Sequence, residues 1–400
     1  MIKTLATIFG TEILKIILAN NLKKINLEMF HFEKDEMNKF KNDFAKYYGN
    51  HFKEICKWAE SIPFIGLAKP KNTEISTIEL IIASDIIKYK DDAKQKINEF
   101  DLLNTNDNIL LLGAPGAGKT TTLKRLIIKY FSEFKSLENP GFPVLVRLRD
   151  IPYESTLYKY ILDIFGITYE DKIVKFNKKI KKKDKENGDI YVEEEVIVEK
   201  VTTYVGKTPI NIFMANFLNE SNCLLLLDGI DELHKSVQLK TFREIEELGL
   251  KLDKARIIMT VRKSELNKII DSFTTFEIAS LSFPQIREIS SKWLTNSDDF
   301  IIELEKKPYK DLANRPIFLT FLLILFEKYS TLPTQPSEVY EDTTYLILKE
   351  WDEHRDIVRL SKYGDFNTRK KIKFISELSY NLTYKIKQKV FSTRDLEQIY

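Results

Sequence analysis

The feature that most constrains the fold of this chain is a short glycine-rich segment in its first third. It reads Gly113-Ala114-Pro115-Gly116-Ala117-Gly118-Lys119-Thr120, directly after the apolar run 108–112 and before a helix-like segment that begins at Thr121. A glycine-rich turn between a strand and a helix points backbone N–H groups inward at the helix N-terminus, where they can bind phosphate. The segment therefore predicts a phosphate-binding loop within a parallel α/β fold.

The residues at the end of this loop have the chemistry needed to bind a nucleoside triphosphate. The Lys119 ammonium can place a positive charge beside the β- and γ-phosphates, and the Thr120 hydroxyl can bind magnesium. We therefore expect ATP or GTP, together with Mg²⁺, at one contiguous stretch of the chain: Gly113, Ala114, Pro115, Gly116, Ala117, Gly118, Lys119, Thr120 and Thr121.

A second apolar run, residues 223–227, ends in a block of carboxylates. It predicts a buried strand that delivers Asp228 to the carboxyl edge of the sheet, where Asp228 can hold magnesium through water. Gly229 gives the backbone room there. Asp231 and Glu232 follow, and their carboxylates can polarise an attacking water. Their spacing leaves open which of the two is the general base.

A third apolar run, residues 256–260, ends in a hydroxyl and is followed shortly by Arg262. A guanidinium at the end of a buried parallel strand would lie near the γ-phosphate and respond to its presence. The three motifs together give the expected catalytic set, which consists of Lys119, Asp228, Asp231, Glu232 and Arg262.

The middle of the chain alternates short apolar runs with helix-like segments, as is typical of a parallel sheet flanked by helices. Residues 1–85 instead carry apolar residues at three-to-four spacing and predict a helical bundle with its own core. The chain reads helical again from Leu281 onward, and Pro333 and Pro336 mark a break in that region. The four expected strands are 108–112, 143–147, 223–227 and 256–260.

Composition limits the classes to which the chain can belong. Its 43% hydrophobic and 30% charged residues are those of a soluble globular protein. The longest apolar stretch, 317–326, is well under the roughly 20 residues of a membrane-spanning helix, and the N-terminus shows no signal-peptide cleavage site. Because only Cys56 and Cys223 are present, we expect no disulfide framework and a cytoplasmic location. A formal net charge of +3 does not indicate a nucleic-acid partner.

A strongly charged segment at residues 170–205 interrupts the α/β pattern. Eight lysines lie between Asp171 and Lys185, and an acidic stretch from Glu193 to Glu199 follows them. Opposite charges on adjoining segments predict a surface hairpin, inserted in the sheet domain, whose two arms neutralise each other. A docking site for a partner or for nucleic acid is the alternative interpretation.

The turn of this hairpin is expected at Asn187-Gly188, a dipeptide that favours tight turns. Folding about it would set Lys182 opposite Glu193 and Lys181 opposite Glu194. Opposite charges at facing positions of two strands stabilise the pairing, so the charge pattern predicts this register.

The three motifs together resemble the NACHT family of STAND nucleotide-switch ATPases. The block from Asp228 to Glu232 is similar to the family's extended Walker B motif, with its additional acidic pair. Met259-Thr260-Val261-Arg262 resembles the sensor strand, although Val261 stands where the family usually has Ser. The same resemblance covers residues 100–330 well and 331–400 loosely.

Further segments extend the resemblance on both sides of the sheet motifs. Residues 144–150 resemble the strand that follows the phosphate-binding helix, and residues 281–286 with Trp293 resemble the start of the family's helical subdomain. Arg315-Pro316 is similar to the motif whose proline packs against the adenine base, although the family usually has a small residue before it. The resemblance therefore adds Pro316 to the expected nucleotide contacts.

The resemblance implies an order of domains and a way of working. The domains would be an N-terminal helical domain at 1–85, a NACHT P-loop NTPase domain at 86–280, a helical subdomain at 281–335 and a winged-helix-like region at 336–400. ADP would hold the protein closed, and ATP with a trigger would open it, so that it hydrolyses ATP slowly and forms a homo-oligomer. A role in bacterial anti-phage immunity is implied, with an unknown ligand or phage component as the trigger.

Two other classes of P-loop protein stay open at this point. A P-loop kinase would pass the phosphoryl group to a small acceptor, whereas the carboxylates that follow Asp228 favour water as the acceptor. A motor or loader on nucleic acid would present a finger arginine to a neighbouring subunit, and one sequence does not identify such a residue.

Overall fold

The chain forms two compact units. The computed structural model describes residues 10–21, 34–64, 67, 69–84, 96–134, 141–183, 190–233, 235–263, 270–353 and 368–386. The first unit comprises Met1–Glu60 and Glu79–Ala279, and the second comprises Ser61–Ile78 and Ser280–Tyr400. This division differs from the four regions expected from the sequence, and whether those regions are separate domains stays a prediction.

The first unit is built on a seven-stranded sheet with the strand order β4-β3-β12-β5-β11-β10-β6. Residues of β5 and β10 are all buried, as expected for parallel strands that are covered on both faces by helices. The prediction of a parallel sheet flanked by helices is thereby confirmed. The parallel strands are β5 (Asn108–Gly113), β6 (Pro143–Arg147), β10 (Leu224–Asp228), β11 (Arg256–Arg262) and β12 (Phe273–Ile278).

Two short antiparallel strands extend this sheet beyond β12. Strand β3 (Ile81–Ser84) pairs with β12, and β4 (Lys96–Asn98) pairs with β3. The prediction of helix throughout residues 1–85 is therefore wrong at β3. A four-residue apolar run cannot be told from a helical segment by periodicity, and the partner of β3 lies far along the chain.

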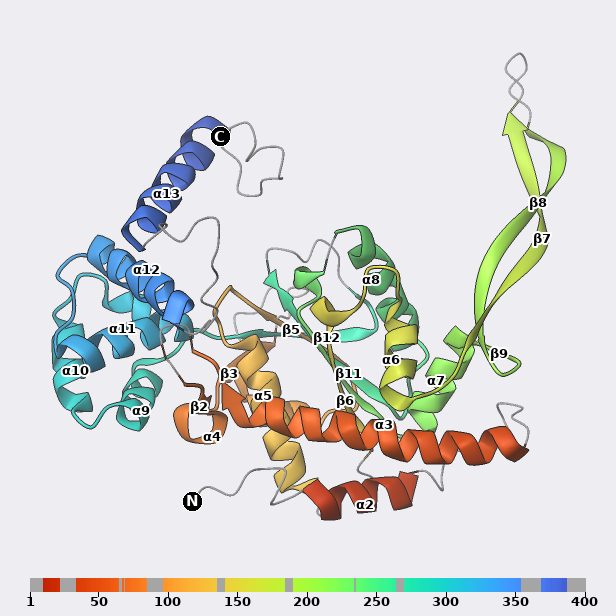
Figure 1. Cartoon of the computed structure of the whole chain (residues 1–400), viewed down its shortest axis with the longest axis horizontal. Helices are drawn as coiled ribbons and strands as arrows, with labels where there is room; N and C mark the ends of the chain where they lie inside the picture. Colours follow the sequence, from red (N-terminus) through yellow and green to blue (C-terminus); the bar gives the residue numbers. More distant parts are fainter. Residues whose placement is uncertain are drawn as a thin grey trace. The chain divides into compact units, whose positions relative to one another are not determined.

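Helices connect the parallel strands and flank the sheet (Figure 1). Two more helices precede the sheet in the sequence. The connecting helices are α5 (Lys119–Ser132), α6 (Leu157–Phe165), α7 (Ile210–Glu220) and α8 (Lys235–Gly249), and the preceding ones are α2 (Gly10–Asn21) and α3 (Lys34–Glu60).

Helix α3 packs against α5, α6 and β6 rather than within a bundle of its own (Figure 1). Its Phe44 ring lies 5.0 Å from that of Phe165, and its Tyr48 ring lies 4.7 Å from that of Phe142, measured between centroids. The expectation of a separate N-terminal core is wrong for this helix, because the 12 residues of α2 cannot cover the apolar face of a helix of 27 residues.

Helix α3 also covers the edge of the sheet at β6. The Leu145 N–H donates to His51 Nε2 at 3.2 Å, and the Tyr48 hydroxyl donates to the Pro143 carbonyl at 3.2 Å. Burial, helped by the charge of Arg147, lowers the pKa of His51 to about 4, so the imidazole is neutral and can accept this bond. An edge that would otherwise template pairing with another strand is thus covered by a helix.

The charged segment forms an antiparallel hairpin of β7 (Glu170–Lys183) and β8 (Ile190–Val205), and the short strand β9 (Thr208–Pro209) pairs with the end of β8. The expected surface hairpin is present as an inserted pair of strands between α6 and α7 (Figure 1). Residues 184–189, and with them the expected turn at Asn187-Gly188, lie outside the described residues.

The predicted register of this hairpin is wrong. Lys182 faces Tyr191 and Lys181 faces Val192, while Glu194 faces Ile180. The predicted register assumed a tight turn at Asn187-Gly188, whereas Lys183 is the register partner of Ile190, so the pairs nearest residues 184–189 are already displaced by two residues. An irregularity between Ile180 and Lys181 then shifts the remaining pairs by one residue, as a β-bulge does. Facing opposite charges do occur further from the turn, where Lys179 faces Glu195 and Lys175 faces Glu199.

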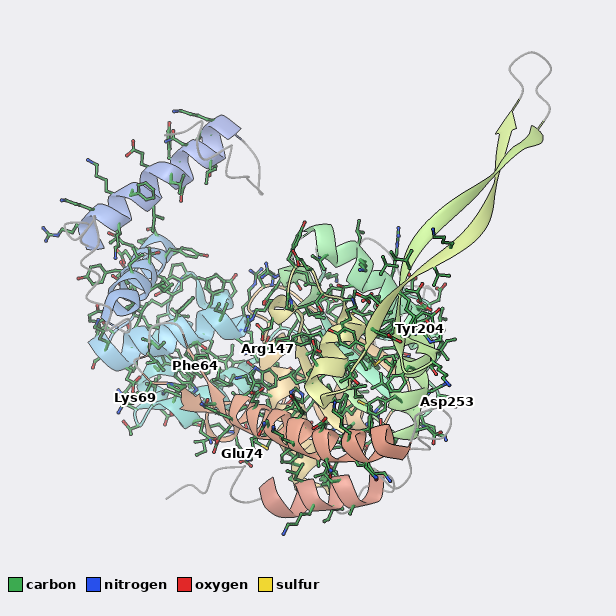
Figure 2. The ribbon with its side chains drawn as sticks, turned by 45° about the vertical axis from the view of Figure 1, so that its right-hand side comes forward. Phe64, Lys69, Glu74, Arg147, Tyr204 and Asp253 are labelled. Carbon is green, nitrogen blue, oxygen red and sulfur yellow. The ribbon has the colours of Figure 1, made fainter. Side chains whose placement is uncertain are left out.

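In its described residues, the second unit is helical apart from one short strand pair. Trp293 Nε1 donates to the Ser76 carbonyl and Lys292 Nζ to the Thr77 carbonyl, both at 2.8 Å, and these bonds tie residues 61–78 to the C-terminal helices. Phe64, labelled in Figure 2, lies 4.8 Å from Trp293 between ring centroids. The elements are β1 (Ser61–Ile62), β2 (Lys71–Asn72), α4 (Thr73–Ser76), α9 (Phe283–Trp293), α10 (Ser297–Glu305), α11 (Pro316–Tyr329), α12 (Pro336–Glu353) and α13 (Thr368–Asn381).

The described part of residues 336–400 consists of helices, and the winged-helix-like arrangement expected there stays a prediction. Across the described residues of the chain, no helix combines the length and the apolar character needed to cross a bilayer.

Candidate active site

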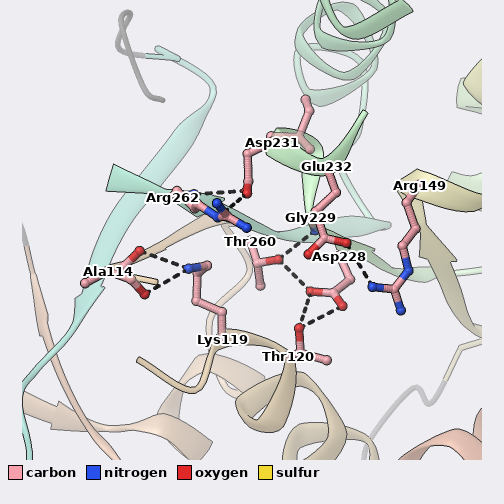
Figure 3. Close-up of polar contacts among 12 residues, drawn as sticks. Ala114, Lys119, Thr120, Arg149, Asp228, Gly229, Asp231, Glu232, Thr260 and Arg262 are labelled. Atoms are coloured by element: carbon pink, nitrogen blue, oxygen red, sulfur yellow. Dashed lines mark hydrogen bonds and ion pairs between the residues drawn. The ribbon is translucent and has the colours of Figure 1, made fainter. Parts of the chain in front are cut away.

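Three neighbouring strands of the main sheet bring the sequence motifs together at their carboxyl ends. Strand β11 lies between β5 and β10 in the sheet. Arg262 is the register partner of Gly113, and Met259 is that of Leu227. The residues that end or follow these strands therefore meet at one edge, as Figure 3 shows.

The loop after β5 needs its glycines. Gly116 and Gly118 have φ angles of 73° and 99°, a left-handed conformation that other residues adopt only with strain. A Cβ added at Gly113 would lie 3.2 Å from the Ala117 Cβ, so the loop has little space for a side chain there. Gly118 caps α5, and the N-terminal N–H groups of that helix consequently open onto the loop.

Lys119 is held over the same loop. Its Nζ donates to the Gly113 carbonyl at 2.9 Å and to the Ala114 carbonyl at 3.2 Å (Figure 3). Burial lowers the pKa of Lys119, while the nearby carboxylates of Asp231 and Asp228 act in the opposite direction. A phosphate in the loop would offer this ammonium a charged acceptor in place of neutral carbonyls.

Asp228 lies at the centre of a hydroxyl network. Thr120 Oγ1 donates toward both Asp228 oxygens, at 3.1 and 3.0 Å, and Thr260 Oγ1 donates to Asp228 Oδ1 at 2.8 Å. The Gly229 N–H in turn donates to Thr260 Oγ1 at 3.0 Å. Burial raises the pKa of Asp228, and the bonds from Thr260 and Thr120 counter this effect. The network holds the carboxylate against the first turn of α5 (Figure 3).

The oxygens of Thr120 and Asp228 fit a magnesium ion. Magnesium in nucleotide sites takes one or two protein oxygens and completes its shell with phosphates and water. Within the described residues, no group of three or more His, Cys, Asp or Glu side chains could hold a metal by itself. A magnesium site completed by phosphates and water needs no cluster of this size. The two protein oxygens that would bind the ion, Thr120 Oγ1 and Asp228 Oδ2, lie 3.0 Å apart.

The two carboxylates that follow Asp228 have different surroundings. The Asp231 side chain is 3% exposed, and its Oδ2 lies 2.6 Å from Arg262 Nε, while its Oδ1 accepts the Arg262 N–H at 3.2 Å. Glu232 is 37% exposed, and its Oε2 accepts from Arg149 Nη1 at 2.9 Å. Figure 3 shows the two pairs on opposite sides of Gly229.

Two residues of this constellation had no assigned role in the sequence analysis, namely Thr260 and Arg149. Thr260 lies two residues before Arg262 on β11, so strand periodicity places both on one side and could have drawn attention to it. Arg149 follows β6, whose last residue Arg147 is the register partner of Asp228. The proximity of Arg149 to the residues that follow β10 can be inferred only when the order of the strands in the sheet is known.

The structure brings together Lys119, Thr120, Asp228, Asp231 and Arg262, with Glu232 beside them (Figure 3). Their roles toward a nucleotide, like those of the loop residues and Thr121, stay predictions. Pro316 is the first residue of α11 in the second unit, and its contact with the base also stays a prediction.

Comparisons with known proteins bear on the same residues. The family model of the NACHT domain matches residues 107–297. No curated protein sequence gave a significant match. Among solved structures, the chain is similar to a RuvB variant from Thermotoga maritima, with 13% identity, 74% of each chain covered and a TM-score of 0.30. It is also similar to the Orc1 protein of Aeropyrum pernix in complex with DNA, with 14% identity, 75% of this chain and 80% of that chain covered, and a TM-score of 0.36.

Similarity to solved structures at this level has no bearing on activity. The family match spans all three strand ends of the site, from the strand before the phosphate-binding loop to beyond Arg262. Residues 107–297 are therefore identified as a NACHT domain, with the phosphate-binding loop and the ends of β10 and β11 inside it.

Proposed function

We propose that this protein is a nucleotide-dependent switch that binds ATP or GTP with Mg²⁺, hydrolyses it slowly and forms a homo-oligomer on activation. The observation that carries the proposal is the pairing of Arg262 with the buried Asp231 carboxylate, beside the Thr120–Asp228 oxygens. An arginine at this edge of the sheet can respond to a γ-phosphate. Its partner, Asp231, lies in the short segment between β10 and α8.

The binding and hydrolytic roles follow from the surroundings of each side chain. Thr120 and Asp228 would hold the magnesium ion, whose charge would stabilise the transferred phosphoryl group. Lys119 would exchange its carbonyl acceptors for phosphate oxygens. Both oxygens of Asp231 accept from Arg262, whereas the more exposed Glu232 shares one oxygen with Arg149. Glu232 is therefore our candidate for the base that orients water, and Asp231 for the residue that positions Arg262.

The switch itself would be a competition for Arg262. A γ-phosphate would attract the guanidinium away from Asp231, and ADP would leave the pair in place. The two nucleotides would thus favour two arrangements of the segment after β10, which is the differential interaction that a population shift requires. A near-complete shift needs about 5 kcal/mol, more than one arginine–phosphate contact supplies, so a trigger is also required.

The resemblance to STAND proteins supports a role in anti-phage immunity in the cytoplasm, with a phage component or another unknown ligand as the trigger. The same resemblance supports Pro316 as the residue that packs against the base.

The test is size-exclusion chromatography with light scattering on wild type and Arg262→Ala. Each protein is measured with ADP or a non-hydrolysable ATP analogue, with and without lysate from phage-infected cells. We expect wild type to form larger particles only with the analogue and lysate, and Arg262→Ala to lose this dependence on nucleotide. Wild type that stays monomeric throughout, yet phosphorylates a small acceptor, would replace the switch by a kinase. Hydrolysis stimulated by DNA or RNA would favour a motor instead.

A further inference from the structure

The β7–β8 hairpin is a two-stranded ribbon that extends away from the main sheet (Figure 1). Its strands have 14 and 16 residues. Among the described residues, β7 pairs only with β8, and β8 has a second partner only at Tyr204 and Val205, where β9 joins it. Both long edges of the ribbon therefore present backbone groups that another strand could pair with.

The root of the ribbon is fixed to the first unit. The Asp171 carboxylate accepts from Lys159 Nζ of α6 at 2.7 Å and from the Thr203 hydroxyl at 2.6 Å. The Lys172 ammonium lies 5.4 Å from the ring centroid of Tyr204, which Figure 2 labels at the base of the strands. The direction in which the ribbon leaves the unit is thus set by specific contacts.

Apolar side chains are exposed immediately beyond this root. Ile173 and Val201 are register partners, and they are 64% and 62% exposed. A hairpin of two strands has no second layer to cover such residues, and an isolated two-stranded ribbon is marginally stable in water. A further strand paired at an edge would place its side chains beside one member of this pair and would satisfy the backbone groups of that edge.

The charges on β7 and β8 determine which strand of a partner molecule can pair with each free edge. Strand β7 carries seven lysines and two acidic residues, whereas β8 carries four glutamates and one lysine. Two copies of β7 side by side would bring lysines together, and two copies of β8 would bring glutamates together. Only β8 of one copy beside β7 of another unites opposite charges along the contact.

We propose that the hairpin joins copies of this chain head to tail, with β8 of one copy beside β7 of the next. This inference rests on the proposed oligomerisation and names the surface that mediates it. When the copies share one orientation, β7 of the second runs antiparallel to β8 of the first, so the antiparallel pattern continues from copy to copy. Such a contact uses two different surfaces and therefore builds a ring or a filament, whereas a twofold dimer would need like strands to meet.

A charge-exchanged variant tests the pairing without changing the charge of the hairpin. It exchanges four lysines of β7 and all four glutamates of β8, through Lys175→Glu, Lys178→Glu, Lys179→Glu, Lys181→Glu, Glu193→Lys, Glu194→Lys, Glu195→Lys and Glu199→Lys. Strand β7 then carries the excess of negative charge and β8 the excess of positive charge, and the facing pairs Lys175–Glu199 and Lys179–Glu195 keep their opposite charges in reversed order. Wild type and the exchanged variant should each pair with their own kind and should not pair with each other.

The measurement is cross-linking with a carbodiimide, which joins an ammonium and a carboxylate that are in contact. Nitrogen-15-labelled and unlabelled proteins are mixed, with ADP or the ATP analogue, so that mass spectrometry separates links between copies from links within one copy. We expect links between β7 and β8 peptides of different copies when both proteins are wild type or both are exchanged. Mixing wild type with the exchanged variant should reduce these links about tenfold, since like charges then face each other.

Three results would overturn the inference: equal linking in the mixed sample, more linking in the mixed sample, and no links between hairpins of different copies. More linking in the mixed sample would indicate a twofold pairing of like strands. Light scattering on the same samples separates this inference from the proposed switch. Nucleotide-dependent oligomers without hairpin links would overturn this inference alone. Hairpin links that are the same with ADP and with the ATP analogue would support it and count against the switch.

Discussion

The edge of the main sheet and the β7–β8 hairpin both concentrate charge on β-strands, but they do so in opposite surroundings. At the sheet edge, Asp228 and Asp231 are almost fully removed from solvent, and the oxygens of each accept bonds from named partners. At the root of the hairpin, the pair of Lys172 with Glu170 is about half exposed on both sides.

This difference in burial determines how strongly a single substitution can affect stability or activity. A buried carboxylate that loses its partner keeps the full cost of desolvation, whereas an exposed ion pair contributes little because water and salt replace it. The sheet edge should therefore respond strongly to single substitutions. The hairpin should respond only when the pattern of several charges is changed, which is why its test exchanges eight residues together.

The largest effect is expected at Lys119. Lys119→Ala should weaken nucleotide binding about 100-fold or more, because it removes the side-chain cation that faces the phosphates. The matched control is Lys129→Ala on the same helix, where the lysine pairs with exposed Glu133 and lies far from the loop. Fluorescent-nucleotide titration measures both. Binding by Lys119→Ala within about threefold of wild type would remove the P-loop assignment.

The next effect concerns turnover rather than affinity. Asp231→Ala combined with Glu232→Ala should reduce hydrolysis about 100-fold or more while leaving the affinity for ADP nearly unchanged, since Glu232 acts on water and Asp231 acts through Arg262, which responds to the γ-phosphate. The structure sharpens this expectation: Glu232→Gln alone should account for most of the loss. Steady-state phosphate release with parallel binding titrations checks both points. Turnover that survives in the double variant would place the base elsewhere.

Most of the sheet could be predicted from the sequence because its parallel strands are continuous apolar runs. Predicted runs 108–112 and 223–227 agree with β5 and β10 to within one residue at each end. Strand β12 was missed because its residues alternate between buried and exposed, so it lacks the uniform apolar character of its neighbours. Strand β3 was missed because its pairing partner lies far away in the sequence.

The site was predictable where a motif carries its own geometry and not where it depends on strand order. The loop glycines and Asp228 follow directly from strand, turn and helix in sequence. The contact of Arg149 with Glu232 requires β6 to lie next to β10, which no local pattern states. The hairpin register failed because it was counted from a tight turn at Asn187-Gly188, whereas Lys183 is the register partner of Ile190, so the pairs nearest the turn are already displaced.

A smaller effect is expected on stability at the end of β11. Arg262→Ala should lower the free energy of unfolding by about 1–2 kcal/mol, because the buried Asp231 loses its charged partner and retains only the backbone N–H. The neighbouring Lys263→Ala is the matched control. Lys263 is 54% exposed and pairs with Glu277, so its removal should change stability by less than about 0.5 kcal/mol. Urea denaturation without nucleotide measures both, and equal effects would show that burial of Asp231 adds nothing to its ion pair.

The smallest effect is expected from removing most of the hairpin. Deleting residues 173–202 and joining Lys172 to Thr203 through a short Gly-Ser linker should change the free energy of unfolding by less than about 1 kcal/mol. The join is short because Lys172 and Thr202 are register partners, and the anchoring bonds from Lys159 and Thr203 to Asp171 are kept. Nucleotide affinity should equal that of wild type, since the phosphate-binding loop and the ends of β10 and β11 are untouched. Denaturation and nucleotide titration on the deletion variant check both expectations. Insoluble protein, or protein that no longer binds nucleotide, would show that the ribbon contributes to the core of the first unit and is more than an inserted surface.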